Sequence, residues 1–204
     1  MALDKIDADV VLLVEGSDDV AVVELLLNAI KPDWKRLVDV QALADGGGLS
    51  AGVAALATVS GFDRVKKVGV LVDADESPKQ IDDQWAKRAD EFSANDLGRQ
   101  LSYCVLPSNS LKGALESLFL QSLTPGDRHF ACVQALTICL DGQTPHTTQA
   151  QKDKLALTTY INSRVKSPYS RIGVALKQDA RDLFDFKHPA FKPLVEFLEN
   201  LTHV

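Results

Sequence analysis

Four short apolar runs, separated by segments with helical spacing, constrain the fold of this chain most strongly. They are Val10–Val14, Leu37–Ala42, Val68–Val72 and Leu101–Leu106. The first and third are continuously apolar and rich in valine and leucine, which is typical of strands buried on both faces of a parallel sheet. An alternation of such strands with helices predicts an α/β fold with a mainly parallel central sheet of about four strands, flanked by helices.

The segments between these runs carry apolar residues three and four positions apart. Residues Val20–Ile30, Ser50–Val59 and Lys79–Leu97 show this pattern, so we expect a helix in each of them. Ser17 and Asp18 precede the first of these helices, and we expect Asp18 to be its N-cap. These helices would cover both faces of the sheet.

The second part of the chain is predicted to be mainly helical. Helical spacing recurs over Phe130–Leu140 and Gln149–Val165 and again in an apolar stripe from Phe191 to Leu201. We expect this stripe to pack in the core, with a dimer contact as the alternative. One compact domain would then consist of a core over residues 1–125 and a helical extension over residues 126–204.

Acidic residues follow two of the predicted strands. Glu15 comes directly after the first, and Asp73 and Asp75 follow the third. The carboxyl ends of parallel strands share one edge of the sheet, so these side chains can be neighbours. Two carboxylates about 4 Å apart repel by roughly 4 kcal/mol at an effective dielectric of 20. Such a cluster persists at neutral pH only with a cation, shared protons or basic neighbours. If an ion binds, oxygen ligands favour Mg²⁺ or Mn²⁺. Each acid taken alone more often caps a helix or a turn.

The residues around these acids resemble the Toprim superfamily, which includes primases, topoisomerases of types IA and II, recombination mediators and OLD-family nucleases. The resemblance covers about the first half of the chain and implies a Toprim-like three-layer sandwich. It is greatest to OLD-like Toprim domains and to small stand-alone relatives. The residues that carry it are Val11–Asp19, with Glu15 after the strand, Val70–Asp75, with its DxD pattern, Gly46–Gly48, Leu106-Pro107 and Gly113–Glu116.

This resemblance implies a role for each acid. Asp73 and Asp75 would bind Mg²⁺, and Glu15 would be either a further ligand or the general acid/base. Asp19 and Glu116 would provide ligands for a second ion, although an acid in the first turn of a helix also simply suits the helix dipole. Two ions could activate the attacking water and stabilise the leaving oxygen of a phosphodiester.

Lys154 and a run of glycines extend the predicted site. OLD-like nucleases carry a lysine near the scissile phosphate, and Lys154 is the candidate by position, with a solvated surface charge as the alternative. Gly46, Gly47 and Gly48 could bind a phosphate at the N-terminus of the following helix. The run matches no established phosphate-loop pattern, so a tight turn is the alternative.

The charge balance bears on the partner. The formal net charge is −6, so DNA or RNA would have to bind at a local basic patch or through metal. Such a patch, leading to the acids, favours Mg²⁺-dependent hydrolysis or transfer at a phosphodiester. A uniformly negative surface favours a non-catalytic module that binds metal, nucleotide or a partner protein, such as a subunit of a bacterial defence system. A homodimer is a further possibility that the sequence leaves undecided. The candidate bases are Arg64, Lys66, Lys67, Arg164, Lys166 and Arg171.

Cysteine usage and hydropathy indicate the compartment. Cys104, Cys132 and Cys139 are an odd number and form no CxxC pair, so we expect buried small hydrophobes in a reducing environment. The first nine residues do not resemble a secretory signal, and no run of about 18 apolar residues is present. A cytoplasmic protein without membrane association is therefore predicted.

Overall fold

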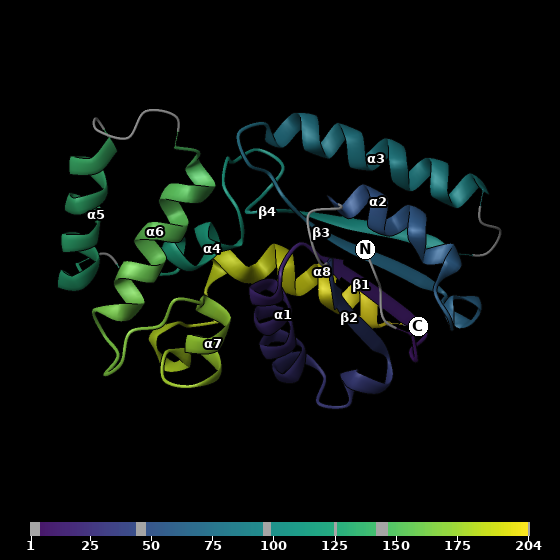
Figure 1. Cartoon of the computed structure of the whole chain (residues 1–204), viewed down its shortest axis with the longest axis horizontal. Coiled ribbons are helices and arrows are strands. Elements are labelled where there is room, and N and C mark those ends of the chain that lie inside the picture. The colour runs from purple at the N-terminus through teal and green to yellow at the C-terminus, as the bar shows by residue number, and fades with distance from the viewer. Residues whose placement is uncertain (1–4, 44–47, 96–98, 125, 142–146, 204) are drawn as a thin grey trace.

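A four-stranded sheet forms the centre of the molecule. The computed structural model describes the chain except for residues 1–4, 44–47, 96–98, 125, 142–146 and 204 (Figure 1). The strands pair in the order β2-β1-β3-β4, and every pairing is parallel. The predicted α/β fold with a parallel central sheet flanked by helices is confirmed. The strands are β1 (Val10–Val14), β2 (Val38–Ala42), β3 (Lys67–Asp73) and β4 (Gln100–Leu106).

Helices connect successive strands, as the alternating pattern predicted. The connections are α1 (Ser17–Ile30), α2 (Gly48–Ala55) and α3 (Pro78–Asn95). Because α2 passes into a short 3-10 helix over Leu56–Thr58, the predicted segment Ser50–Val59 is only partly α-helical. The N-cap of α1 is Gly16, so the prediction of Asp18 as the cap is wrong. Asp18 instead accepts a hydrogen bond from the Gly173 N–H across 3.1 Å.

The two faces of the sheet are covered by different helices (Figure 1). Alternate residues of β1 explain this, since successive side chains of a strand point to opposite faces. Val11 and Leu13 pack with the α2 and α3 side, whereas Leu12 and Val14 belong to the larger cluster with α1 and α8 (Lys192–Thr202). All five residues of β1 are buried, so this strand lies at the centre of the core.

A glycine in β3 allows α8 to lie close against the sheet. A Cβ added to Gly69 would stand 2.6 Å from the Leu201 Cδ2, which is too close for two carbon atoms. Phe191, Leu194, Leu198 and Leu201 are all buried. The predicted apolar stripe is therefore core packing.

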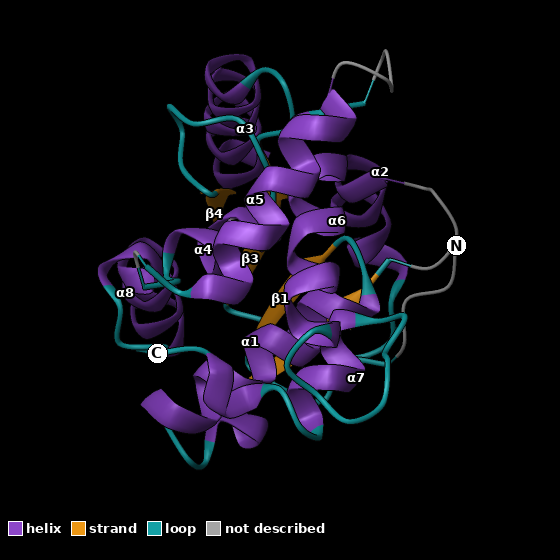
Figure 2. Ribbon diagram, turned by 90° about the vertical axis from the view of Figure 1, so that its left-hand side faces the viewer, coloured by secondary structure: helices purple, strands orange, loops and turns teal. Residues whose placement is uncertain are grey.

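The remaining helices lie beyond the carboxyl ends of the strands. They are α4 (Leu115–Gln121), α5 (Arg128–Asp141), α6 (Gln149–Asn162) and α7 (Ile172–Lys177). Figure 2 views the molecule from this side, with α5 and α6 in front of the strands. The pattern did not predict α7, because its six residues are too few to display a helical period.

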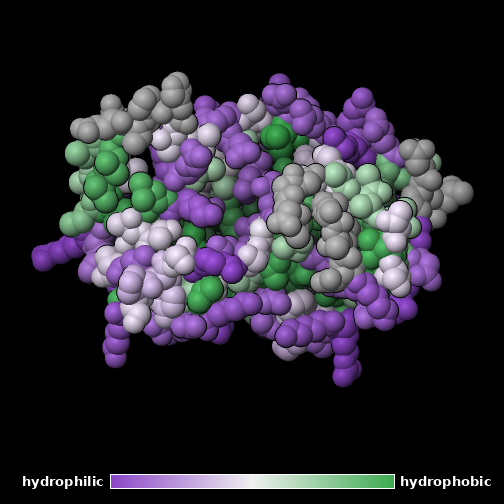
Figure 3. Space-filling view, viewed as in Figure 1, coloured by the Kyte–Doolittle hydropathy of each residue, from purple (hydrophilic) through white to green (hydrophobic). Residues whose placement is uncertain are grey.

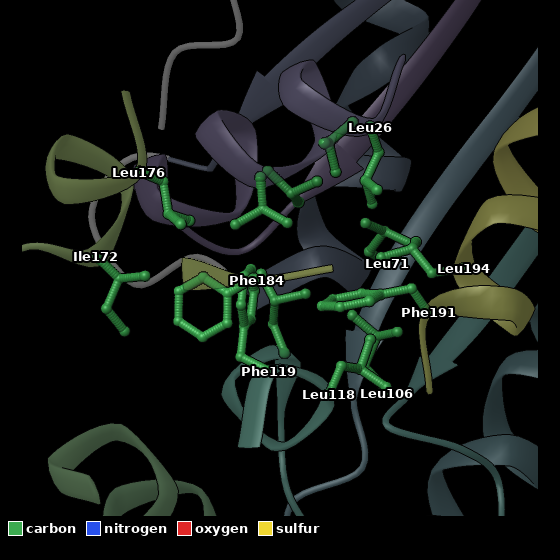
Figure 4. Packing of buried hydrophobic residues seen from close by; sticks show 14 of the residues in the cluster. Leu26, Leu71, Leu106, Leu118, Phe119, Ile172, Leu176, Phe184, Phe191 and Leu194 are labelled. Carbon is green, nitrogen blue, oxygen red and sulfur yellow. The ribbon is translucent and has the colours of Figure 1, made fainter. Parts of the chain in front are cut away.

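Aromatic side chains join these helices to the core. Phe119 of α4 packs edge to face against Phe184 and Phe191, with ring centroids 4.8 and 5.1 Å apart (Figure 4). Both rings belong to the cluster that contains Leu71 of β3 and Leu106 of β4. Residues beyond position 126 thus share one buried cluster with the sheet.

Helix α5 is the least buried helix of this part. Cys132 and Cys139 are both exposed on it, so the prediction that the cysteines are buried is wrong for these two. Leu136 and Ile138 are exposed as well, and Figure 3 shows hydrophobic surface over α5 at the left of the molecule. Cys104 in β4 is partly buried, and burial raises the pKa of its thiol to about 12. None of the helices in the described part of the chain is long and apolar enough to cross a membrane.

Candidate functional site

Glu15 and Asp19 stand at the carboxyl end of β1. Glu15 follows Val14 directly and is exposed, whereas Asp19 lies in the first turn of α1 and is only partly exposed. The Asp19 Oδ2 accepts the Gly16 N–H across 2.8 Å. This bond satisfies one donor at the start of the helix. It also holds Asp19 in the turn after β1, where the charge of Glu15 reaches it.

Asp73 and Asp75 stand at the end of the neighbouring strand β3. Asp73 is the last residue of β3 and pairs with Leu106 of β4, and its Oδ1 accepts the Leu115 N–H across 3.2 Å. Asp75 has a φ of 48°, and it is the one residue other than glycine with positive φ in the described part of the chain. Such left-handed backbone is strained for a residue with a side chain and recurs at functional sites.

Glu116 comes to the same edge from α4. It occupies the first turn of that helix and is partly buried. The set of Glu15, Asp19, Asp73, Asp75 and Glu116 is called the acidic edge below. It unites three segments of the chain at the carboxyl ends of two adjacent strands, as the sequence pattern predicted for Glu15 and the DxD pair.

Burial, with a further contribution from neighbouring acids, raises the pKa of every carboxyl in the acidic edge. Burial is the main reason why the pKa of Asp19 is raised to about 6; the Gly16 hydrogen bond opposes this shift, and the charges of Glu116, Glu15 and Asp18 contribute to it. Burial is also the main reason why the pKa of Asp73 lies well above its usual value. The charges that add to this shift come from Asp19, Glu15, Glu116 and Asp75.

The other three carboxyls follow the same rule. Partial burial raises the pKa of Glu15, and the nearby charge of Asp75 adds to the shift. Burial is the main reason why the pKa of Asp75 is raised, and the nearby charge of Glu76 adds to the shift. Burial raises the pKa of Glu116, although its own backbone N–H and Lys154 lower it. Lys154 is therefore a positive charge that opposes these shifts at the acidic edge, through its effect on Glu116.

The donor set suits a hard divalent cation, since all five side chains offer carboxylate oxygens, which Mg²⁺ and Mn²⁺ prefer. As these side chains stand, however, no group of three or more His, Cys, Asp or Glu residues in the described part of the chain is drawn together as a metal centre. Asp73 and Asp75, with Glu15 beside them, are the residues that would hold an ion. Binding would require their carboxylates to converge.

Lys154 lies on the exposed side of α6, where its charge reaches Glu116. The structure therefore brings the predicted lysine near the acidic edge. Gly46 and Gly47 lie outside the described residues. Gly48 begins α2 with a φ of 66°, which favours glycine, and an added Cβ would have open space around it.

The bases proposed from sequence do not gather in one groove. Lys66 and Lys67 lie at the amino end of β3, opposite the acidic edge, where Lys66 pairs with Asp9 at 2.6 Å. Arg64 pairs with Asp7 on the same side. Arg171, in contrast, lies beside the β1 turn and pairs with Asp18 at 3.3 Å.

A cluster of polar residues near the acidic edge was missed by sequence reasoning. Lys112 pairs with Glu76 at 2.9 Å, and Ser117 donates a hydrogen bond to Asp153. The spacing of Gln149 and Asp153, four residues apart on one helix, was the available signal, since such residues share a helix face. Nothing in the sequence indicated that this face meets the DxD turn.

A separate hollow of about 860 Å³ lies on the α2 and α3 side of the molecule. Phe62, Arg88, Phe92 and Arg99 line it together with small residues of α2. Arg99 is held by the backbone carbonyls of Phe62, Asp63 and Val65. None of the carboxylates of the acidic edge lines this hollow.

Fold and site together define a parallel α/β protein with a carboxylate-rich edge at the ends of its two central strands. The chain belongs to DUF3226, a family described as a protein of unknown function, whose match extends over residues 9–203. No curated protein and no solved structure matches the chain.

Proposed function

We propose that this protein is a Mg²⁺- or Mn²⁺-dependent phosphodiesterase of nucleic acid, related to the OLD-like Toprim nucleases. The observation that carries the proposal is the acidic edge itself, in which burial raises the pKa of all five carboxyls and neighbouring acids add to each shift. Structural carboxylates normally have basic or hydrogen-bonding partners, and perturbed groups of this kind cluster at functional sites. A divalent cation would supply the missing positive charge.

Each acid then has a distinct task. Asp73 and Asp75 bind the ion, and Asp73 is held in place by the Leu115 N–H. Glu15 is either a further ligand or the group that takes a proton from the attacking water. Asp19 and Glu116 provide oxygens for a second ion. When bound, such an ion lowers the pKa of water and stabilises charge on the leaving oxygen.

Lys154 supports the proposal as a cation whose charge lowers the pKa of Glu116. Its ammonium group would contact a phosphate oxygen on the solvent side of the acidic edge, because α6 presents it on its exposed side. A point charge of this kind stabilises the negative charge that develops on phosphorus-bound oxygens.

The direct test is cleavage of supercoiled plasmid, linear DNA, single-stranded DNA and RNA by purified protein with Mg²⁺ or Mn²⁺. We expect nicking or degradation that EDTA stops and that Asp73→Ala abolishes. Asp90→Ala, which removes one exposed acid from α3, should retain full activity. If the wild-type protein leaves every substrate intact with both metals, the nuclease proposal is wrong.

The alternative is a non-catalytic module that binds metal, nucleotide or a partner protein, for example within a defence system. The observation that favours it is the charge distribution: Arg64, Lys66 and Lys67 lie away from the acidic edge, and the net charge is −6. Binding of Mn²⁺, measured by electron paramagnetic resonance, without cleavage of any nucleic acid would favour this module.

A further inference from the structure

The turn that carries Asp75 is held by a closed ring of hydrogen bonds. Its first link is a pair of backbone bonds between Asp75 and Gly113, with N···O distances of 2.8 and 2.9 Å. These two bonds hold Asp75 in the left-handed conformation with a φ of 48°. Because Leu115 donates its N–H to Asp73, the short segment 113–115 contacts both aspartates of the DxD pattern.

Ser117 fixes this segment. Its buried hydroxyl accepts the Ala114 N–H across 3.1 Å and donates to Asp153 of α6. The hydroxyl packs directly on Gly113, where an added Cβ would stand 2.1 Å from the Ser117 Oγ. Gly113 has a φ of 130°, so both the backbone and the space around it require glycine.

Gln149 closes the ring on the other side. Its side-chain Nε2 donates to the Asp153 Oδ1 across 2.7 Å, and its backbone N–H donates to the Glu76 Oε1 across 2.5 Å. Glu76 is the residue after Asp75 and also binds Lys112. Every group in the ring has a donor or an acceptor as its neighbour, which makes such networks rigid.

We propose that Asp153 is a positioning residue, which fixes both Asp73 and Asp75 through Ser117 and the segment 113–115. Helix α6, from the C-terminal part of the chain, would then complete the acidic edge without contributing a ligand. For metal binding this inference rests on the function proposed above. Second-layer partners of metal ligands commonly change metal affinity by about 10-fold to 100-fold when they are removed.

A polarity swap separates positioning from general stability. Asp153→Asn keeps an acceptor for Ser117 but replaces the charged acceptor of the Gln149 amide with a neutral N–H₂ group, so the Gln149 amide must rotate to keep a weaker bond. The double variant Gln149→Glu with Asp153→Asn restores this bond in the reverse direction and keeps the net charge of the chain. Asp90→Asn, at an exposed position of α3, is the matched control for the loss of one charge.

The experiment compares amide hydrogen exchange of Asp75 and Gly113, measured by NMR without metal, with the affinity for Mn²⁺. We expect Asp153→Asn to accelerate exchange of both amides roughly three- to tenfold and to weaken Mn²⁺ binding about tenfold. The double variant should return both quantities to within about twofold of wild type, and the control should change neither.

The outcomes distinguish the two proposals. Unchanged exchange in Asp153→Asn, or no recovery in the double variant, would overturn the positioning role. If exchange responds as expected but the wild-type protein binds no Mn²⁺, Asp153 still positions the DxD turn and the metal-dependent function is wrong.

Discussion

Asp127 and Asp73 show two opposite ways in which this chain accommodates a carboxylate. Asp127 accepts the N–H groups of His129 and Phe130, the Tyr160 hydroxyl and the Arg164 guanidinium, at 2.8–3.2 Å. Burial raises its pKa, but these donors together lower the pKa below its usual value.

Asp73, in contrast, accepts the Leu115 N–H and has four acidic side chains around it, and its pKa is raised. The chain thus neutralises an acid fully where the role is structural. At the acidic edge it keeps acids together at a cost in stability, which is the behaviour expected of a functional site.

The largest expected difference between the two sites is their response to a divalent ion. Mn²⁺ at about 100 times its dissociation constant stabilises a protein by roughly 2.7 kcal/mol, which raises the Tm of a chain of this size by about 5–11 °C. We expect this rise in wild type and in Asp127→Asn, but not in Asp73→Asn. Differential scanning calorimetry with Mn²⁺ and with EDTA measures it, and an equal rise in all three proteins would contradict a metal site at the acidic edge.

The second difference is whether replacing the aspartate by neutral asparagine raises or lowers the stability of the protein, measured in EDTA. Asp73→Asn keeps an acceptor for Leu115 and removes repulsion, so we expect a gain of about 1 kcal/mol, or a rise of roughly 2–4 °C in Tm. Asp127→Asn loses the ion pair with Arg164 and turns an amide toward its donors, so its Tm should fall. Urea unfolding of both variants gives the signs, and a loss of stability in Asp73→Asn would show that its charge is satisfied.

The third difference is the dependence of stability on pH. The pKa of Asp19 is about 6 in the folded protein and 3.8 in the reference state, so the folded chain binds the proton more tightly. The ionised Asp19 carboxylate therefore destabilises the folded protein fully above about pH 6, and this destabilisation is relieved as the pH falls from about 6 toward 4.

In EDTA we therefore expect the Tm to rise by about 2 °C on going from pH 7.5 to pH 5.5, because the folded protein takes up protons at the acidic edge. Neighbouring carboxyls share these protons, so the uptake belongs to the set and not to Asp19 alone. Asp19→Asn should reduce this rise. Asp127 has the opposite sign, since its lowered pKa contributes stability above about pH 4 that is lost in more acidic solution. A Tm that falls between pH 7.5 and pH 5.5 would contradict the repulsion inferred at the acidic edge.

The smallest difference concerns two lysines. Lys154→Met removes the cation near Glu116 and should weaken binding of a single-stranded oligonucleotide about twofold to fivefold. Lys66→Met removes an exposed ion pair at the opposite edge, which contributes at most about 1 kcal/mol to stability, and should leave binding unchanged. Fluorescence anisotropy at fixed salt tests both, and equal effects would place the nucleic acid elsewhere.

The strands and their parallel pairing could be predicted because short apolar runs alternate with helical segments, whereas the order of the strands in the sheet was not predicted. The same logic placed Glu15 near Asp73, since parallel strands end at one edge. The ring through Ser117, Gln149 and Asp153 could not be predicted in this way. It depends on how α6 docks against the turn after β3, and side-chain spacing within one helix carries no information about its partner.

The contact between Gly69 and Leu201 has a consequence for producing parts of this chain. A fragment that stops before residue 192 lacks the side chains that shield one side of β3, including Leu194, Leu198 and Leu201. The exposed strand surface would then be prone to aggregation. Expression trials aimed at a minimal α/β half should therefore retain the last helix, or supply it in trans as a peptide.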